Sequence, residues 1–92
     1  MTSLTYAANH TVVMKSLSYE PKTIEVRVGD TIQWTNKAQT KHSATFKDHS
    51  ELNTKLVLPG SSSAKIPFAK AGTYPYECDV HGSAMSGEVV VK

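Results

Sequence analysis

Apolar and polar residues alternate along much of the chain, and this alternation predicts short β-strands. Ile24, Val26 and Val28 alternate with charged residues, which is typical of a strand with one buried face. A glycine and an aspartate follow as a turn signal. The alternation then resumes in residues 31–36, around Ile32 and Trp34. The two runs therefore predict two consecutive strands with a turn between them.

The same pattern predicts further strands, and two stretches interrupt it. The strands are expected near residues 11–17, at Leu56 and Leu58, at Ile66 and Phe68, from Gly72 through Cys78, and at Val89 and Val91. Residues 47–55 do not alternate, so we expect an irregular segment there with a helical turn. Pro75 has no backbone N–H, so its strand is expected to be locally unpaired.

About seven or eight short strands separated by turn residues indicate an all-β protein, an antiparallel sandwich or barrel. The 92 residues suffice for a single domain, which we place over residues 1–92. Val, Ile, Leu and Phe together supply 19 residues, which is enough for a modest core. Low net charge argues against disorder.

Charge and hydropathy exclude several classes of function. The net charge of +2 gives no strong basic field, so nucleic acid is not an expected partner. The longest clean apolar run is Val89–Val91, far short of the roughly 18 residues of a membrane span. Residues 1–8 show no basic region followed by an apolar stretch, so they do not form a secretory signal. The protein is therefore either cytosolic or the mature part of a longer chain.

Three sulfur and nitrogen donors lie close together near the C-terminus. Cys78, His81 and Met85 fall within eight residues, and His42 offers a second imidazole upstream. A strand ending at Cys78, a tight loop and a strand returning after Gly87 would direct these donors to one place. Two histidines, a cysteine and a weak axial methionine are the ligands of blue-copper sites. The single cysteine excludes an intramolecular disulfide and a Cys₄ or Cys₂His₂ zinc site.

These residues resemble the cupredoxins, the small blue copper proteins typified by plastocyanin, amicyanin and pseudoazurin. The resemblance covers most of the chain and includes residues 19–36, residues 41–43 and the Tyr-x-Tyr-x-Cys-x-x-His-x-x-x-Met-x-Gly motif at residues 74–87. It implies a Greek-key sandwich and one copper ion per chain. The implied metal ligands are His42 Nδ1, Cys78 Sγ, His81 Nδ1 and Met85 Sδ.

The chain differs from the pattern that it resembles in the plastocyanins at three places. Three residues separate His81 from Met85, where plastocyanins usually have four and amicyanins two. Ser43 stands where plastocyanin-like proteins commonly carry an asparagine that ties the two ligand loops together, and a hydroxyl offers fewer hydrogen bonds. Glu77 stands where plant plastocyanins have a tyrosine used in docking. The photosynthetic partners of plastocyanin are therefore not carried over to this chain.

Each candidate ligand also has a plainer interpretation. Cys78 alone would be read as a buried apolar filler, and Met85 as core packing. His10 and His49 compete with His42 for the second imidazole position. The spacing of Cys78, His81 and Met85 favours the copper site over these interpretations.

The resulting hypothesis is a one-electron carrier that cycles between Cu(II) and Cu(I) and is not an enzyme. A multicopper oxidase would need more than the four histidines present, and no oxyanion motif supports a Cys–His nucleophile. Copper storage or delivery with the same ligands stays as the alternative. Redox partners are expected to dock transiently near His81, beside the small residues 82–84. The resemblance further implies a monomer in the periplasm or another extracytoplasmic compartment.

Overall fold

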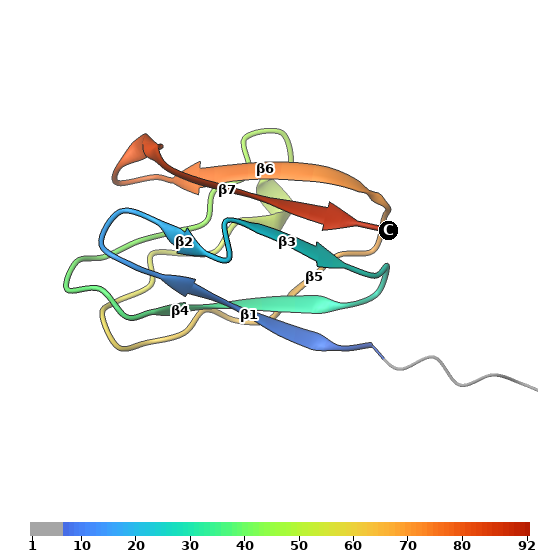
Figure 1. Cartoon of the computed structure of the whole chain (residues 1–92), viewed down its shortest axis with the longest axis horizontal. Coiled ribbons are helices and arrows are strands. Elements are labelled where there is room, and N and C mark those ends of the chain that lie inside the picture. The colour runs from blue at the N-terminus through green and yellow to red at the C-terminus, as the bar shows by residue number, and fades with distance from the viewer. Residues whose placement is uncertain (1–6) are drawn as a thin grey trace, which may run out of the picture.

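The computed structural model describes residues 7–92, in which strands and one short helical turn are arranged around a common interior (Figure 1). The elements in chain order are β1 (Asn9–Met14), β2 (Tyr19–Glu20), β3 (Thr23–Val26), β4 (Thr31–Asn36), the 3₁₀ turn η1 (Ser50–Leu52), β5 (Ile66–Pro67), β6 (Gly72–Cys78) and β7 (Gly82–Val91). The expected segmentation into seven or eight strands is confirmed. Residues 1–6, which belong to the stretch where no secretory signal is expected, lie outside the described residues.

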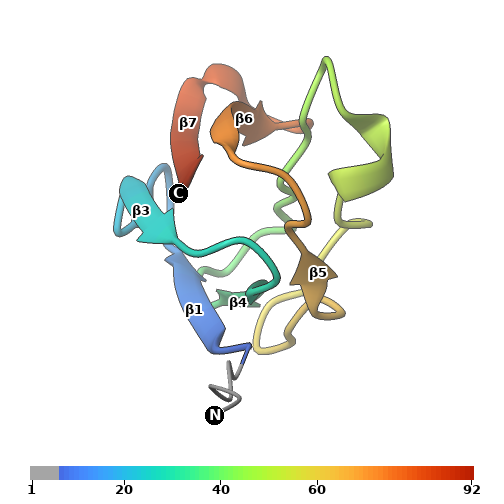
Figure 2. The ribbon, with the colours of Figure 1, turned by 90° about the vertical axis from the view of Figure 1, so that its right-hand side faces the viewer.

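The strands form two sheets that face each other. The first sheet has the order β2-β1-β4-β5 and the second has the order β3-β7-β6. β1 runs parallel to β4 and β3 runs parallel to β7, whereas β6 and β7 are antiparallel. In Figure 2 the strands are seen nearly end-on and surround one interior. The expected all-β sandwich is therefore confirmed. It is not purely antiparallel as expected, because β1–β4 and β3–β7 are parallel pairs.

Alternating side chains of both sheets fill the interior, as the period of a strand requires. Trp34 of β4 and Tyr76 of β6 are both buried, and Trp34 Nε1 donates a hydrogen bond of 3.3 Å to the Tyr76 hydroxyl. The Phe46 ring packs against Trp34 and Tyr76, with centroid distances of 6.0 and 5.0 Å. The rings of Trp34, Phe46 and Tyr76 thus join the two sheets, two residues before the end of β6.

The expected strand at Leu56 and Leu58 is wrong. The structure has an isolated bridge at Val57, and Val57 is buried whereas both leucines are exposed. Three consecutive apolar residues leave the phase of the alternation undecided, and here the middle residue faces the core. A second isolated bridge joins Thr45 to Glu77 of β6.

Residues 47–55 contain the expected helical turn, whereas Pro75 does not interrupt its strand. The expected helical turn is present as η1. Pro75 remains within β6, opposite Glu88 of β7. β6 is an edge strand of its sheet, and its next alternate residue, Glu77, directs its N–H away from β7 to Thr45. The ring nitrogen of Pro75 faces that same outer side, so the β6–β7 ladder loses no hydrogen bond.

The return strand after the cysteine begins earlier than expected. β7 starts at Gly82 rather than after Gly87. Its pairing skips residues 83–85, because Cys78 lies opposite Gly82 and Glu77 lies opposite Ser86. A bulge of this kind changes the direction in which nearby side chains point, and it is often found next to a functional site. Figure 1 shows the turn between β6 and β7 at the same end of the molecule as the ends of β1 and β4.

No helix among the described residues is long and apolar enough to cross a membrane.

Candidate metal centre

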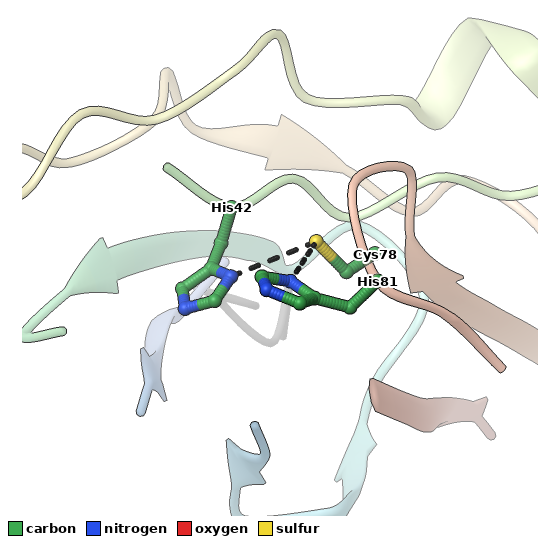
Figure 3. Close-up of side chains that lie close together, drawn as sticks. All are labelled: His42, Cys78 and His81. Carbon is green, nitrogen blue, oxygen red and sulfur yellow. Dashed lines mark hydrogen bonds between the residues drawn. The ribbon is translucent and has the colours of Figure 1, made fainter. Parts of the chain in front are cut away.

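Three side chains from distant parts of the chain converge at one end of the sandwich (Figure 3). His42 follows β4, Cys78 is the last residue of β6, and His81 lies in the turn before β7. Cys78 Sγ lies 3.6 Å from Nδ1 of His42 and 3.6 Å from Nδ1 of His81. The imidazole centroids of the two histidines are 4.9 Å apart. The sequence expectation that these three residues meet is therefore matched by the geometry.

The backbone of the His42 segment is held by Val57. His42 N donates to Val57 O at 3.2 Å, and Val57 N donates to His42 O at 2.7 Å. The buried amide of Asn36 adds hydrogen bonds to the carbonyls of Thr40 and Val57, at 2.8 and 2.9 Å. Asn36 thereby fixes the loop between β4 and His42. Hydrogen bonds of this kind orient a metal ligand and limit its movement.

Ser43 joins the His42 segment to the turn after Cys78. Its hydroxyl accepts a hydrogen bond of 2.9 Å from Asp79 N and lies 3.0 Å from the hydroxyl of Thr45. The Tyr19 hydroxyl donates to the Ser43 carbonyl. Burial raises the pKa of Tyr19, so this phenol stays protonated and keeps donating. A serine therefore does link the two ligand segments, through a backbone donor.

His42 is fully buried, and its surroundings favour the neutral imidazole. Burial lowers the pKa of His42, and the nearby His81 lowers it further, with a weaker opposing effect from the Lys15 backbone. A neutral imidazole keeps a lone pair on one nitrogen. Nδ1 of His42 faces Sγ of Cys78, and Nε2 is buried on the other side of the ring. His42 is thus set up to bind a cation rather than a proton.

The donors fit a single thiolate-binding metal ion. The ligand atoms of His42, Cys78 and His81 all lie within 4.8 Å of one another. Nitrogen and sulfur ligands about 2.0–2.3 Å from one ion, at an angle of roughly 110°, lie about 3.6 Å apart. Thiolate and imidazole together suit copper in either oxidation state. Among the described residues, this is the one group of histidine, cysteine and carboxylate side chains close enough to hold a metal.

Met85, the expected fourth ligand, is fully buried. It lies in the bulge of β7, three residues after Gly82, which pairs with Cys78. Its burial fits an axial donor and also fits core packing. The assignment of Met85 as a ligand stays a prediction.

The two rival histidines lie elsewhere. His10 Nε2 is 2.9 Å from Oδ2 of Asp30, a residue at the turn before β4. His49 packs edge-on against Tyr74, with ring centroids 4.9 Å apart, and Nδ1 lies 3.6 Å from Glu51. Neither belongs to the cluster, so the sequence ranking of His42 above them agrees with the structure.

Sequence reasoning missed the residues that hold the ligands. Val57 reads as an ordinary apolar residue, and its pairing with His42 leaves no local signal in the sequence. Tyr19 and Asn36 were noted only as part of the strand resemblance. Asn36 continues the inward-facing positions of Ile32 and Trp34, and a polar residue at such a position is the one signal in the sequence that points to a structural role.

The sequence profile of the cupredoxin-like domain matches residues 3–91. The chain is 34% identical to the chloroplastic plastocyanin of Tetradesmus obliquus, over 84% of this chain and 60% of that protein. It is 33% identical to the amicyanin of Paracoccus denitrificans, over 88% of this chain and 63% of that protein. A solved structure of the Cu(I) form of an amicyanin mutant is similar with a TM-score of 0.79 and 27% identity, covering 97% of this chain and 86% of the other. The chain thus spans about three fifths of the length of these two curated relatives.

Proposed function

The chain belongs to the cupredoxin-like domain family, and from this premise we propose that it is a type 1 (blue) copper protein that carries single electrons. The observation that carries the proposal is the convergence of His42, Cys78 and His81. These three residues would hold the copper ion together with Met85. When bound, copper would supply a one-electron couple between Cu(II) and Cu(I).

The protein holds the proposed ligands in fixed positions and shields them from water. His42, Cys78 and Met85 are each fully buried, so water is excluded from that side of the site. The hydrogen bonds of Val57 and Ser43 hold the two ligand segments. A site that moves little when its charge changes favours fast electron transfer, because little reorganisation opposes the step.

His81 offers the route to the surface. It is half-buried, whereas His42 is fully covered. The neighbouring Ser83 and Ala84 are exposed and small, so a partner can approach the His81 ring closely. Contacts between redox partners usually bury less than about 1,200 Å², which keeps them short-lived. A transient redox partner docking near His81 is therefore part of the proposal.

The proposal extends to organisation and location. Residues 1–92 would act as one copper-binding domain and as a monomer. The compartment would be extracytoplasmic, such as the periplasm, since a thiolate copper site is best kept apart from competing cytosolic thiols.

The test separates a carrier from a storage or delivery protein. The copper-loaded chain is taken through several cycles of ascorbate reduction and ferricyanide oxidation, then passed over a desalting column. A carrier keeps about one copper per chain through every cycle. Loss of copper on reduction would favour delivery instead. Cys78→Ser serves as the matched variant and is expected to lose copper in the first cycle.

A further inference from the structure

Two leucines stand exposed on the outer side of the segment that pairs with His42. Leu56 and Leu58 are 52% and 53% exposed, whereas Val57 between them is only 4% exposed. The backbone of Val57 forms both hydrogen bonds to His42. The two leucines therefore lie on the outward side of the segment that supports a proposed metal ligand.

The leucines line a groove of about 470 Å³. The half-buried Ile66 also contributes to its apolar lining, and Ser61–Ser63 contribute hydroxyl groups. Exposed apolar side chains gathered along a hollow, with polar groups beside them, are typical of a protein interaction site.

The charge around this groove is of one sign. Lys55 lines it, and no carboxylate is among its lining residues. Lys65 directly precedes Ile66, and Lys41 lies opposite Leu58 because the antiparallel bridge pairs His42 with Val57. All three lysines are exposed. Within residues 7–92 none of the three takes part in an ion pair.

We propose that this basic–apolar face docks an acidic redox partner protein. The face is made of the following residues: Lys41, Lys55, Leu56, Leu58, Lys65 and Ile66. The proposal rests on the proposed function, because it assigns a partner class to the same copper protein. It goes beyond the expected contact near His81, since none of residues 82–84 lines the groove. The partner's apolar side chain would enter the groove while its carboxylates meet the lysines.

Charge and shape favour a protein over two other occupants. A second copy of this chain would bring the same lysines, and like charges facing each other oppose association. An anionic membrane would match the lysines, but a lipid surface suits a protruding apolar residue better than a hollow. A groove of about 470 Å³ has room for several side chains of a protein partner.

Docking on this face would place the partner beside the support of His42. The outward leucines flank the residue whose backbone bonds to His42. A bound partner would therefore cover the segment that holds the fully buried ligand, while the ring of His81 remains at its own surface.

The test maps binding on the reduced, copper-loaded protein by NMR, with the pentapeptide Glu-Leu-Glu-Leu-Glu as probe. We expect amide shifts at residues 41, 55–58 and 64–66, and weaker binding as salt rises. The double variant Leu58→Ser/Lys55→Glu is expected to weaken binding about tenfold or more, the worth of burying one leucine. The control Val28→Ser/Lys70→Glu makes the same charge change at exposed residues outside the groove and is expected to leave binding unchanged.

Each other outcome overturns the assignment. Shifts confined to residues 82–84, equal weakening by the control, or no shifts at all would remove this face as the docking site. Binding to vesicles of anionic phosphatidylglycerol in the absence of peptide binding would replace the protein partner with a membrane. The visible band of each variant is recorded first. A missing band signals failure of the copper site, and an intact band without shifts signals failure of the docking face alone.

Discussion

Ser43 shows how one side chain joins two segments that carry candidate ligands. Its hydroxyl accepts from Asp79 N, next to Cys78, while its carbonyl accepts from Tyr19. A serine hydroxyl can both donate and accept, and here it also lies 3.0 Å from the Thr45 hydroxyl. The Ser43 hydroxyl accepts from the backbone of Asp79, and the Tyr19 hydroxyl donates to the Ser43 carbonyl.

Ser43→Ala should therefore loosen the turn after Cys78. The loss of one hydrogen bond is expected to lower the free energy of unfolding by about 0.5–1.5 kcal/mol. It should also shift the absorption band of the copper-loaded protein, because Asp79 adjoins Cys78. Urea unfolding and a visible spectrum measure the two effects. Ser83→Ala, at an exposed serine of the neighbouring turn, is the control. An unchanged spectrum in Ser43→Ala would mean that the hydrogen bond between Asp79 and Ser43 does not influence the copper site.

Met85→Leu tests the axial ligand. Removing a weak donor that favours Cu(II) should raise the reduction potential. The swap conserves volume, so it should cost less than about 1.5 kcal/mol of stability. Voltammetry of the copper-loaded variant gives the potential. An unchanged potential would assign Met85 to core packing alone.

At the residue scale, the sequence predicts the ligands better than their supports. Cys78 and His81 are close in sequence and lie on a recognisable loop, so spacing alone brings them together. His42 is 36 residues from Cys78, and its place in the site was predicted from the resemblance. Val57 could not be predicted, because a bridge between two loops depends on the whole fold.

Among the elements, β7 shows most clearly how local sequence determines packing. Gly87 lies opposite Tyr76 in the β6–β7 ladder. A Cβ at Gly87 would lie 2.8 Å from the Lys22 carbonyl and 2.8 Å from the Tyr76 ring. Only glycine fits this close approach between a backbone and an aromatic ring.

Gly87→Ala is expected to destabilise the protein by about 1–3 kcal/mol, as overpacking of a core does. The backbone of Lys22 cannot move aside as a flexible side chain would. Chemical denaturation measures the loss, with Ser86→Ala as the neighbouring control. Equal stability of Gly87→Ala and the control would show that β7 shifts freely at this point.

Asp30 ties together the beginnings of two strands. Its carboxylate accepts from Ala8 N at 2.9 Å and from Arg27 N at 3.0 Å, and it lies 2.9 Å from His10 Nε2. The backbone hydrogen bonds from Ala8 and Arg27, followed by His10, lower the pKa of Asp30 from 3.8 to about 2. The turn before β4 is thus fixed to the chain entering β1.

This lowered pKa predicts a loss of stability in acid. The carboxylate stabilises the fold fully above pH 3.8, its ordinary pKa, and this contribution is lost as the pH falls through about 2. Asp30→Asn should flatten the decline in unfolding free energy over that window. Denaturation curves at several pH values compare it with Asp48→Asn, which changes an exposed aspartate. The same acid profile in wild type and Asp30→Asn would contradict the assignment.

At the scale of elements, alternation works where it is long and fails where it is short. The alternation in β4 and β6 predicted the buried faces, including that of Trp34 and that of Tyr76. The alternation at Ile24, Val26 and Val28 held only in part, because β3 ends at Val26 and Val28 is exposed. Residues 56–58 are all apolar, so their phase depended on which residue met the core. The early start of β7 was hidden because glycine, serine and alanine at residues 82–84 carry no alternation.

In the whole molecule, the turn that carries His81 lies at one end of the sandwich. Figure 1 shows the turn after β6 and the ends of β1 and β4 at one end, with the C-terminus at the other. The parallel pairs β1–β4 and β3–β7 tie the sheets along their length. Cys78 and Met85 belong to the same buried cluster as the core residues, so the site is built on the end of the core.

Copper should stabilise the folded chain by binding it in preference to the unfolded chain. Free copper at 100 times its Kd would add about 2.7 kcal/mol. Calorimetry with one equivalent of Cu(II), and again after chelation, should show a higher Tm for the loaded form. Cys78→Ser should lose most of the rise. A rise of the same size in that variant would place the stabilising copper elsewhere.

The central claim is that His42, Cys78 and His81 form one thiolate copper site. Its most direct test is the visible absorption spectrum of the protein with one equivalent of Cu(II), followed by ascorbate and reoxidation. The account predicts an intense blue or green band that bleaches, returns, and is absent in Cys78→Ser. A wild-type protein without the band, or a Cys78→Ser protein that keeps it, would contradict the account.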